Sequence, residues 1–219
     1  MPLKIDLHVH TCYSGDSLIT PSELIAEAVR KGLDGISITD HDTVAGALKM
    51  IRMIRGGNCG RPIIIPGIEV STRSGHILGI NVLEPIPRGL SVEETVERIH
   101  DAGGIAIAAH PQTFFKDGVG LSPKILRFGL DAIEVINSSL FPFYPLTRIG
   151  RRFAEHYNIP QTAGSDAHIV EAIGLSYTLV KIDDLNADSI IEAIRRGLTT
   201  PFGRGIPIQL RIKKALKIK

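Results

Sequence analysis

The chain has 219 residues, with 25 Lys and Arg against 23 Asp and Glu, which gives a formal net charge of +2 at pH 7. This length can bury a single core, so one domain needs neither disulfides nor a structural metal to hold it together. The balanced charge argues against a protein that binds nucleic acid through its overall charge. A content of 43% hydrophobic and 22% charged residues argues against global disorder.

Cys12 and Cys59 are the two cysteines. Two cysteines exclude a disulfide framework and favour a reducing compartment. We expect Cys12 to be a partly buried structural thiol and assign no role to Cys59. Residues 1–6 lack the charged leader and apolar core of a signal peptide, and the longest apolar runs fall short of the roughly 20 residues of a membrane span. The protein is therefore predicted to be cytoplasmic, with no membrane partner.

Short apolar runs alternate with amphipathic stretches along the chain. Two helices are predicted to begin at capping boxes, one formed by Thr20 and Glu23 and one by Ser91 and Glu94. Buried strands are predicted at residues 3–7, 35–39, 62–66, 77–83, 105–109, 132–136 and 161–164, and further helices at 44–55, 143–157 and 186–196.

This alternation predicts an α/β protein with a parallel sheet and right-handed crossovers. Seven strands in a single domain of roughly 200 residues fit a small or distorted (β/α) barrel, with a doubly wound open sheet as the alternative. We place the domain at residues 1–205. Residues 206–219 are a basic C-terminal tail or a closing element. We favour a solvated terminus for this segment. The alternatives are a last strand or helix that packs on the barrel, or a weak contact for phosphate-rich partners.

Ionisable side chains gather where the predicted strands end. Asp6, His8 and His10 alternate along the end of the first strand, so the period of two puts them on one face. The carboxyl ends of parallel barrel strands meet at one mouth, which carries the active site. The other members of this group are Asp16, Asp40, His41, Asp42, Glu69, His76, His110, Glu134, Asn137, Asp166 and His168.

Helix capping explains only part of this group, because it accounts for Asp40, Asp42 or Asn137 individually. Six of the eight histidines lie at these strand ends, and neither capping nor packing requires imidazole there. The other two, His100 and His156, lie in predicted helices and are ordinary surface residues. A mouth filled with imidazoles and carboxylates is poorly solvated unless cations lie between them. The pattern therefore predicts metal binding.

Five motifs, in this order, resemble those of the PHP family, the polymerase and histidinol phosphatase domain, from residue 6 to about residue 200. The motifs are Asp6-Leu7-His8-Val9-His10-Thr11, Thr39-Asp40-His41, Gly67-Ile68-Glu69, Ala109-His110-Pro111 and Gly164-Ser165-Asp166-Ala167-His168. The resemblance implies a distorted (β/α)7 barrel, two or three bound divalent metal ions and the hydrolysis of phosphoesters.

The resemblance also implies a set of nine metal ligands. A first ion would lie among His8, His10, Glu69 and Asp166, a second among Glu69, His76 and His110, and a third among Asp16, His41 and His168. Glu69, Asp166 and His168 are the predicted catalytic residues. Asp6 and Asp40 are predicted to accept hydrogen bonds from histidine rings and so to orient them.

Imidazole and carboxylate ligands without a thiolate fit Zn, Mn or Fe, and no organic cofactor is implied. Such ions would lower the pKa of a bridging water to give a hydroxide nucleophile, polarise the phosphoryl oxygens and stabilise the leaving alkoxide. We therefore predict a di- or trinuclear phosphoesterase. Its substrate would be a phosphate ester of a small molecule, either a nucleotide or a histidinol-phosphate-like compound.

Two alternative functions stay open. A PHP-type exonuclease or nucleic-acid processing protein fits the basic C-terminus, whereas 5% aromatic residues and the lack of Trp argue mildly against it. A metal-free scaffold has no use for the intact ligand set. The oligomeric state stays open as well.

Arg204, which lies between two glycines, is the predicted contact for the substrate phosphate, with Arg73 and Lys116 as alternatives. A solvated surface charge is the simpler interpretation of each. The 33 residues between His76 and His110 leave no room for an inserted domain that would cover the mouth.

Overall fold

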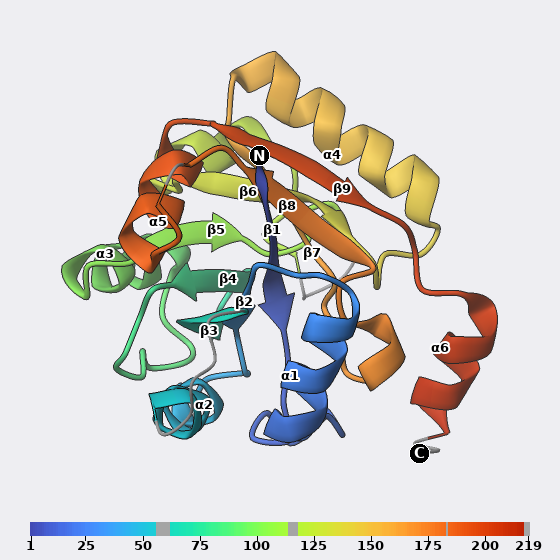
Figure 1. Ribbon diagram of the computed structural model, residues 1–219. Coiled ribbons are helices and arrows are strands. Elements are labelled where there is room, and N and C mark those ends of the chain that lie inside the picture. The colour runs from blue at the N-terminus through green and yellow to red at the C-terminus, as the bar shows by residue number, and fades with distance from the viewer. Residues whose placement is uncertain (56–61, 114–117, 183, 217–219) are drawn as a thin grey trace.

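The computed structural model describes residues 1–55, 62–113, 118–182 and 184–216 (Figure 1). One mixed sheet holds the strands of these residues, in the order β7-β6-β5-β4-β3-β2-β1-β8-β9. The strands are β1 (Leu3–Val9), β2 (Gly35–Ile38), β3 (Ile63–Thr72), β4 (Gly75–Ile80), β5 (Ile105–Ala108), β6 (Ala132–Asn137), β7 (Gln161–Gly164), β8 (Ser176–Val180) and β9 (Thr199–Gly203).

The sheet curls until the chain after β7 meets β1, so the barrel is nearly closed. The Asp166 amide donates to the His8 carbonyl at 2.7 Å, and the His10 amide donates to the Ala167 carbonyl at 3.1 Å. These bonds tie the carboxyl end of β1 to the loop that follows β7. The α/β barrel-like architecture predicted from the sequence is confirmed.

The prediction of a fully parallel seven-stranded sheet is wrong. β4 runs antiparallel to both β3 and β5, because a two-residue connection joins β3 and β4 as a hairpin. β8 and β9 were not predicted, and both run antiparallel to their neighbours. β9 contains Pro201 and lies at the end of the strand order, where a missing amide donor is tolerated.

β3 is twice as long as predicted and continues through Glu69 to Thr72. Glu69 therefore lies within the strand and not after it. Its amide donates to the Asp40 carbonyl at 3.1 Å, and the Asp42 amide donates to the Glu69 carbonyl at 2.9 Å. This extension of β3 carries Glu69 into the mouth of the barrel.

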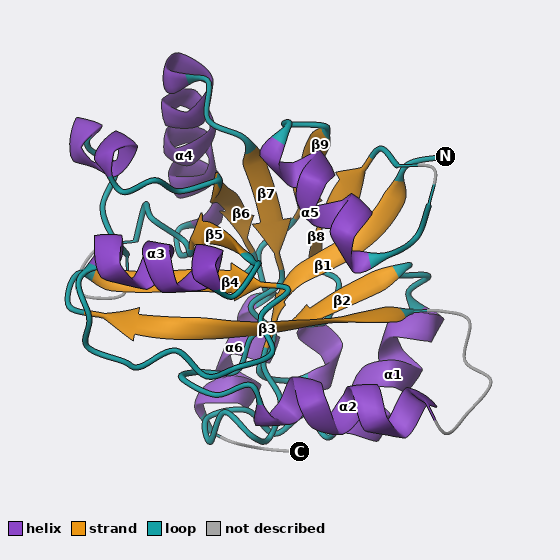
Figure 2. Cartoon of the chain, turned by 90° about the vertical axis from the view of Figure 1, so that its left-hand side faces the viewer, coloured by secondary structure: helices purple, strands orange, loops and turns teal. Residues whose placement is uncertain are grey.

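The helices lie around the outside of the sheet (Figure 2). Both predicted capping boxes are present, with Thr20 and Ser91 each accepting from the amide of the glutamate three residues on. The helices are α1 (Pro21–Arg30), α2 (Ala45–Arg55), α3 (Val92–Asp101), α4 (Phe143–Tyr157), α5 (Ala187–Arg195) and α6 (Ile208–Ala215), with short 3-10 helices η1 (Pro123–Arg127) and η2 (Val170–Ala172).

The alternation along β1 separates the core from the site. Ile5, Leu7 and Val9 belong to clusters of buried apolar side chains that include residues of α1 and α5. Asp6 and His8 point to the other face and are also fully buried. One strand therefore supplies both apolar packing and polar groups, as its period of two requires.

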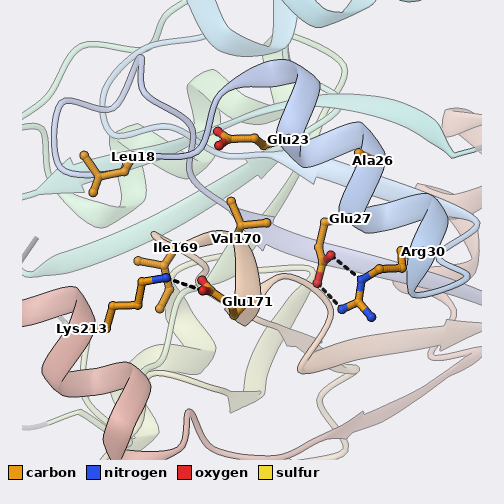
Figure 3. Close-up of a pocket in the computed structure, with 9 residues that line it drawn as sticks. All are labelled: Leu18, Glu23, Ala26, Glu27, Arg30, Ile169, Val170, Glu171 and Lys213. Atoms are coloured by element: carbon orange, nitrogen blue, oxygen red, sulfur yellow. Dashed lines mark hydrogen bonds and ion pairs between the residues drawn. The ribbon is translucent and has the colours of Figure 1, made fainter. Parts of the chain in front are cut away.

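The basic C-terminal segment forms helix α6 and packs on the barrel. Ile206, just before it, is buried, and its amide donates to the Ser138 carbonyl at 2.9 Å. Lys213 forms an ion pair with Glu171 of η2 (Figure 3). The helix alternative thus describes residues 208–215 better than a solvated tail does, while the domain boundary at residue 205 stays a prediction.

Three further points concern the predictions about cysteines and the membrane. Cys12 is exposed, so the expectation of a partly buried thiol is wrong. Cys59 falls outside the described residues. Within the described ranges, the helices fall short of the length and apolar character that a membrane crossing requires.

Candidate metal centre

All nine predicted ligands meet at one end of the barrel. Parallel strands contribute residues at or beyond their carboxyl ends, and antiparallel β4 contributes His76 from its beginning, which lies at the same end. The nine residues are His8, His10, Asp16, His41, Glu69, His76, His110, Asp166 and His168, and groups of them place ligand atoms within 4.8 Å of one another.

The first group contains His8, His10, Glu69 and Asp166. The Nε2 atoms of His8 and His10 lie 3.1 Å apart, and each is 3.1–3.2 Å from Oε2 of Glu69. Oδ1 of Asp166 lies 3.4 Å from His10 Nε2 and 3.7 Å from His8 Nε2. Ligands about 2.0–2.1 Å from a tetrahedral ion lie about 3.3 Å from each other, so these separations fit one ion.

Hydrogen bonds on the far side of the rings orient the two histidines. His8 Nδ1 lies 3.1 Å from Oε1 of Glu134, and His10 Nδ1 lies 3.2 Å from Oγ of Ser14. An ionised carboxylate only accepts hydrogen bonds, so His8 Nδ1 carries the proton and, in the neutral ring, Nε2 presents a lone pair to the group. A metal ligand needs this tautomer.

Glu69 connects the first group to a second one. Its other oxygen, Oε1, lies 3.0 Å from Nδ1 of His76 and 3.2 Å from Nε2 of His110. The two carboxylate oxygens therefore face two separate sets of imidazole nitrogens. This is the arrangement expected of a carboxylate that bridges two ions.

A third group forms on the open side of the mouth. Oδ2 of Asp16 lies 2.9 Å from Nε2 of His168 and 3.5 Å from Nε2 of His41. His168 Nδ1 lies 3.0 Å from the Asp166 carbonyl, which acts as an acceptor and leaves Nε2 facing Asp16. His10 lies close enough to join this group.

Burial and charge act against each other in the centre. Burial alone lowers the pKa of His10, but its contacts with Asp166 and Glu69 prevail and raise that pKa to about 9. The pKa of Glu69 moves the other way, because His8 and His10 outweigh burial and hold it well below its usual range. Without a metal, these imidazoles hold protons that offset the carboxylates, and a cation can replace those protons.

The donor set fits divalent ions. Nδ1 of His41 is buried without a hydrogen-bond partner in the described part of the chain, yet it lies 3.3 Å from Oε2 of Glu69. A cation shared by the two atoms would satisfy both. Imidazole nitrogens and carboxylate oxygens suit several transition metals.

Asp6 and Asp40 play a different part from the one predicted. Asp6 accepts from the backbone amides of Ser165 at 2.9 Å and Gly174 at 2.8 Å. Asp40 accepts from the amide and hydroxyl of Thr11 at 2.6 and 2.7 Å. Both carboxylates fix the loops that carry ligands, and the prediction that they orient histidine rings is wrong. Burial raises the pKa of Asp6 to about 6 despite these bonds.

Glu134 and Asn137 are the functional residues that the predicted ligand set omitted. Oε2 of Glu134 accepts from the His110 amide and from Nδ2 of Asn137, both at 2.9 Å. Asn137 Nδ2 also lies 3.3 Å from Oδ2 of Asp166. Glu134 thus supports His8 and the backbone of His110 together. Its place in the sixth predicted strand, three residues before Asn137, was the available signal.

Local backbone geometry at the site is unusual. His110 and Asp166 adopt positive φ values of 30° and 51°, which cost free energy for residues with a Cβ. Gly164 lies so close to β1 that a Cβ there would meet Cβ of His8 at 2.3 Å. The surrounding hydrogen bonds therefore hold the ligands in positions that the local sequence does not favour.

A cavity of about 220 Å³ opens above these groups. Six of its lining residues are predicted ligands from the three groups, and Thr113, Asn137, Ser139 and Leu140 complete its wall. Arg204 is exposed and does not line it. Arg73 is exposed and donates to the Gly89 carbonyl, and Lys116 falls outside the described residues. The role of Arg204 in phosphate binding stays a prediction.

Comparison with known proteins identifies the family. The PHP domain family matches residues 6–158, and the PHP-associated family matches residues 148–199. The first match covers well over half of the chain, so the chain belongs to the PHP family, and the resemblance seen in its motifs is confirmed.

Two relatives show the range of proteins similar to this chain. An uncharacterized protein from Methanocaldococcus jannaschii is 37% identical over 146 residues, which are 62% of this chain and 82% of that protein. A 5'-3' exoribonuclease from Haemophilus influenzae is 30% identical over 111 residues, which are 49% of this chain and 39% of that protein.

Solved structures share the fold at low sequence identity. PsfC from Pseudomonas syringae PB-5123 has a TM-score of 0.75 at 18% identity and covers 98% of this chain and 97% of its own. The lesion-specific endonuclease Q from Pyrococcus furiosus has a TM-score of 0.68 at 20% identity, over 90% of this chain and 56% of its own. The fold therefore occurs in proteins of different size.

Proposed function

We propose that the protein is a di- or trinuclear metal-dependent phosphoesterase that hydrolyses a phosphate ester of a small molecule. The observation that carries this proposal is the position of Glu69, whose two oxygens lie 3.0–3.3 Å from nitrogens of five histidines. Few arrangements other than a cluster of cations give a buried carboxylate such surroundings.

Divalent ions bound there would supply Lewis acidity toward the phosphoryl group and a water acidified enough to attack it. Neighbouring side chains fix the positions of the residues that would hold these ions. Glu134 keeps the proton of His8 on the side away from the mouth. Asn137 spans Glu134 and Asp166, and the hydroxyl of Ser139 donates to the Asp166 carbonyl at 3.3 Å. Polar groups that are already fixed in place do not have to reorient during the reaction.

The charges in the mouth suit an anionic substrate once cations are present. Three divalent ions bring a charge of about +6, and Asp16, Glu69 and Asp166 return about −3, so the loaded mouth is cationic. A phosphate dianion would be attracted to it, whereas the metal-free mouth would repel it once its histidines are neutral. Phosphate binding is therefore expected to depend on the metal.

Metal loading followed by a substrate panel tests the proposal. Protein stripped with a chelator is reloaded with Zn, Mn or Fe, its metal content is measured, and phosphate release is followed for nucleoside monophosphates, sugar phosphates and histidinol phosphate. We expect two to three ions per chain and hydrolysis only in the loaded protein. A metal content near zero without uptake on incubation would contradict the proposal.

A nucleic-acid phosphodiester is the second candidate substrate, because similar proteins include a 5'-3' exoribonuclease and an endonuclease Q. A labelled single-stranded oligonucleotide in the same loaded reactions separates the two candidates. Shortening of the oligonucleotide without release of phosphate from the small esters would favour nucleic-acid processing.

A further inference from the structure

The metal pocket is smaller than pockets that enclose a complete ligand. Its volume is about 220 Å³. Pockets that enclose a complete small ligand span roughly 300–1,000 Å³. With the phosphate in the pocket, the group that is esterified to it would therefore lie over the rim of the mouth.

Two exposed aromatic residues follow the segment that forms one wall of this cavity. Ser139 and Leu140 line the cavity, and the next residue, Phe141, is 72% exposed. Tyr144, the second residue of α4, is 80% exposed. Phe143 between them instead packs against the buried core. A flat, exposed apolar ring on the residue that follows the cavity wall suits a flat ring in the ligand.

Arg211 of α6 fixes this side of the rim. Its Nη2 donates to the carbonyls of Ser138 at 3.1 Å and Leu140 at 2.8 Å, and its Nη1 donates to that of Ser139 at 3.0 Å. Its guanidinium carbon also lies 5.3 Å from the centre of the Phe141 ring, a cation–π distance. One cation thus holds three successive carbonyls and the aromatic ring that follows them.

The contacts of Arg211 bring together segments that are far apart in the sequence. The chain leading into α6 runs past the start of α4 (Figure 1), and the Ile206 amide binds the Ser138 carbonyl at 2.9 Å. The ring of Phe141 keeps most of its surface open even though Arg211 lies against it. A ring that is held on one side and open on the other is prepared for stacking, because a held ring loses less freedom when a ligand binds.

We propose that Phe141, positioned by Arg211, is the stacking surface for a nucleobase of the substrate whose phosphate occupies the metal pocket. Tyr144, three residues further along the chain, provides a second exposed ring. This inference rests on the proposed function and narrows its substrate class to esters that carry a base. The base belongs either to a mononucleotide or to the end of a single strand.

Binding of non-hydrolysable phosphonates to the metal-loaded full chain tests this without requiring turnover. The wild type is expected to bind a nucleoside 5′-phosphonate roughly tenfold more tightly than the same ribose phosphonate without a base, as one stacked base provides. Phe141→Ala is expected to lose that preference with unchanged affinity for the base-free ligand. Phe141→Trp should keep it, whereas Phe141→Leu, which is apolar but not flat, should lose most of it.

Two more variants separate stacking from a general effect on folding. Arg211→Lys keeps the charge but not the planar set of donors, so it is expected to reduce the base preference more than it reduces the affinity for the base-free phosphonate. Leu83→Ala removes a side chain that is 55% exposed beyond the other end of β4, and is expected to change neither affinity.

Equal affinities of the wild type for the two phosphonates would overturn the inference. A base preference that survives in Phe141→Ala would overturn it as well, and so would the absence of binding of either ligand. Failure of the proposed function has a different signature, namely no phosphate release from any ester while the base preference in binding persists. A single-stranded tetranucleotide phosphonate that binds more tightly than the mononucleotide would assign the rim to a strand end, and equal affinity would assign it to a mononucleotide.

Discussion

The metal centre and a second cavity hold their charged side chains in different ways. The second cavity, about 480 Å³, lies between α1, η2 and α6 (Figure 3). In it Glu27 pairs with Arg30 at 2.7 Å, and Glu171 pairs with Lys213. In the metal centre, the side chain of Glu69 is just 1% exposed, and its ion-pair partners among the described residues are all histidines.

The difference shows that the kind of partner, and not the size of a cavity, marks a metal site. Lys and Arg carry permanent charges, so Glu27 and Glu171 of the larger cavity are neutralised by the protein itself. Imidazoles are neutral in their metal-binding form and leave the carboxylates of the centre in need of cations. The smaller cavity is therefore the candidate metal site.

The largest expected effect is the loss of the bridging carboxylate. Glu69→Ala removes the group that faces two sets of nitrogens, so we expect hydrolysis by the metal-loaded protein to fall at least ~100-fold. Phosphate release and thermal melts measure activity and folding separately. The fold should survive, because Glu69 points into the mouth and its removal leaves no apolar cavity.

The matched control is Glu97→Ala, an exposed glutamate of α3, which should keep wild-type activity. Asp42→Ala is a poor control, because Asp42 accepts from the Ser71 amide at 2.8 Å and from its hydroxyl at 3.0 Å. Equal losses in the glutamate variants would show that Glu69 is not the bridge.

A smaller effect is expected from the residue that orients His8. Glu134→Gln keeps the shape of the side chain and one oxygen that can accept from the His110 amide and Asn137, but the NH2 group that replaces Oε1 cannot accept from Nδ1 of His8. We expect metal affinity to fall about 10- to 100-fold, as is usual for residues that support a ligand. Competition with a fluorescent chelator measures this, with the exposed Glu155→Gln of α4 as control. Unchanged affinity would assign Glu134 to folding alone.

The protons held by the metal-free centre predict a pH effect on stability. The pKa of His10 is raised from its ordinary 6.5 to about 9. A raised histidine pKa contributes stability that is complete below the ordinary value and is lost as the pH rises through the folded value. The melting temperature of the metal-free protein should therefore fall between about pH 6.5 and 9, whereas bound metal should remove this loss.

Calorimetry in buffers of different ionisation enthalpy provides an independent check of the same protons. Metal binding at pH 7 should release protons, and the release should shrink as the pH approaches about 9. Uptake of metal without proton release at pH 7 would show that the histidines of the centre are already neutral.

The smallest effect is expected in the second cavity. Lys213→Ala breaks the pair with Glu171, whose side chains are 30% and 43% exposed. Exposed pairs contribute about 0–1 kcal/mol, so the free energy of unfolding should change little and the metal content not at all. Urea denaturation and elemental analysis check both. A loss of metal in this variant would mean that α6 supports the centre and would weaken the contrast between the two regions.

The sequence by itself determined the local features. Asp6, His8 and His10 alternate along β1 and just beyond its end, and this spacing fixes the face that they share. The two capping boxes and the five motifs likewise depend only on neighbouring residues. These features were enough to predict a barrel-like α/β fold and a ligand set at its mouth.

Only the tertiary structure decided how distant segments combine. Three features depend on contacts that no local pattern encodes. They are the direction of β4, the strand pairing that extends β3 through Glu69, and the hydrogen bond between Glu134 and His8, which are 126 residues apart. The same holds for Arg211, which crosses 71–73 residues of sequence to hold the rim of the mouth. Spacing in the chain selects the face a side chain takes, whereas its partner is set by which strands and helices pack together.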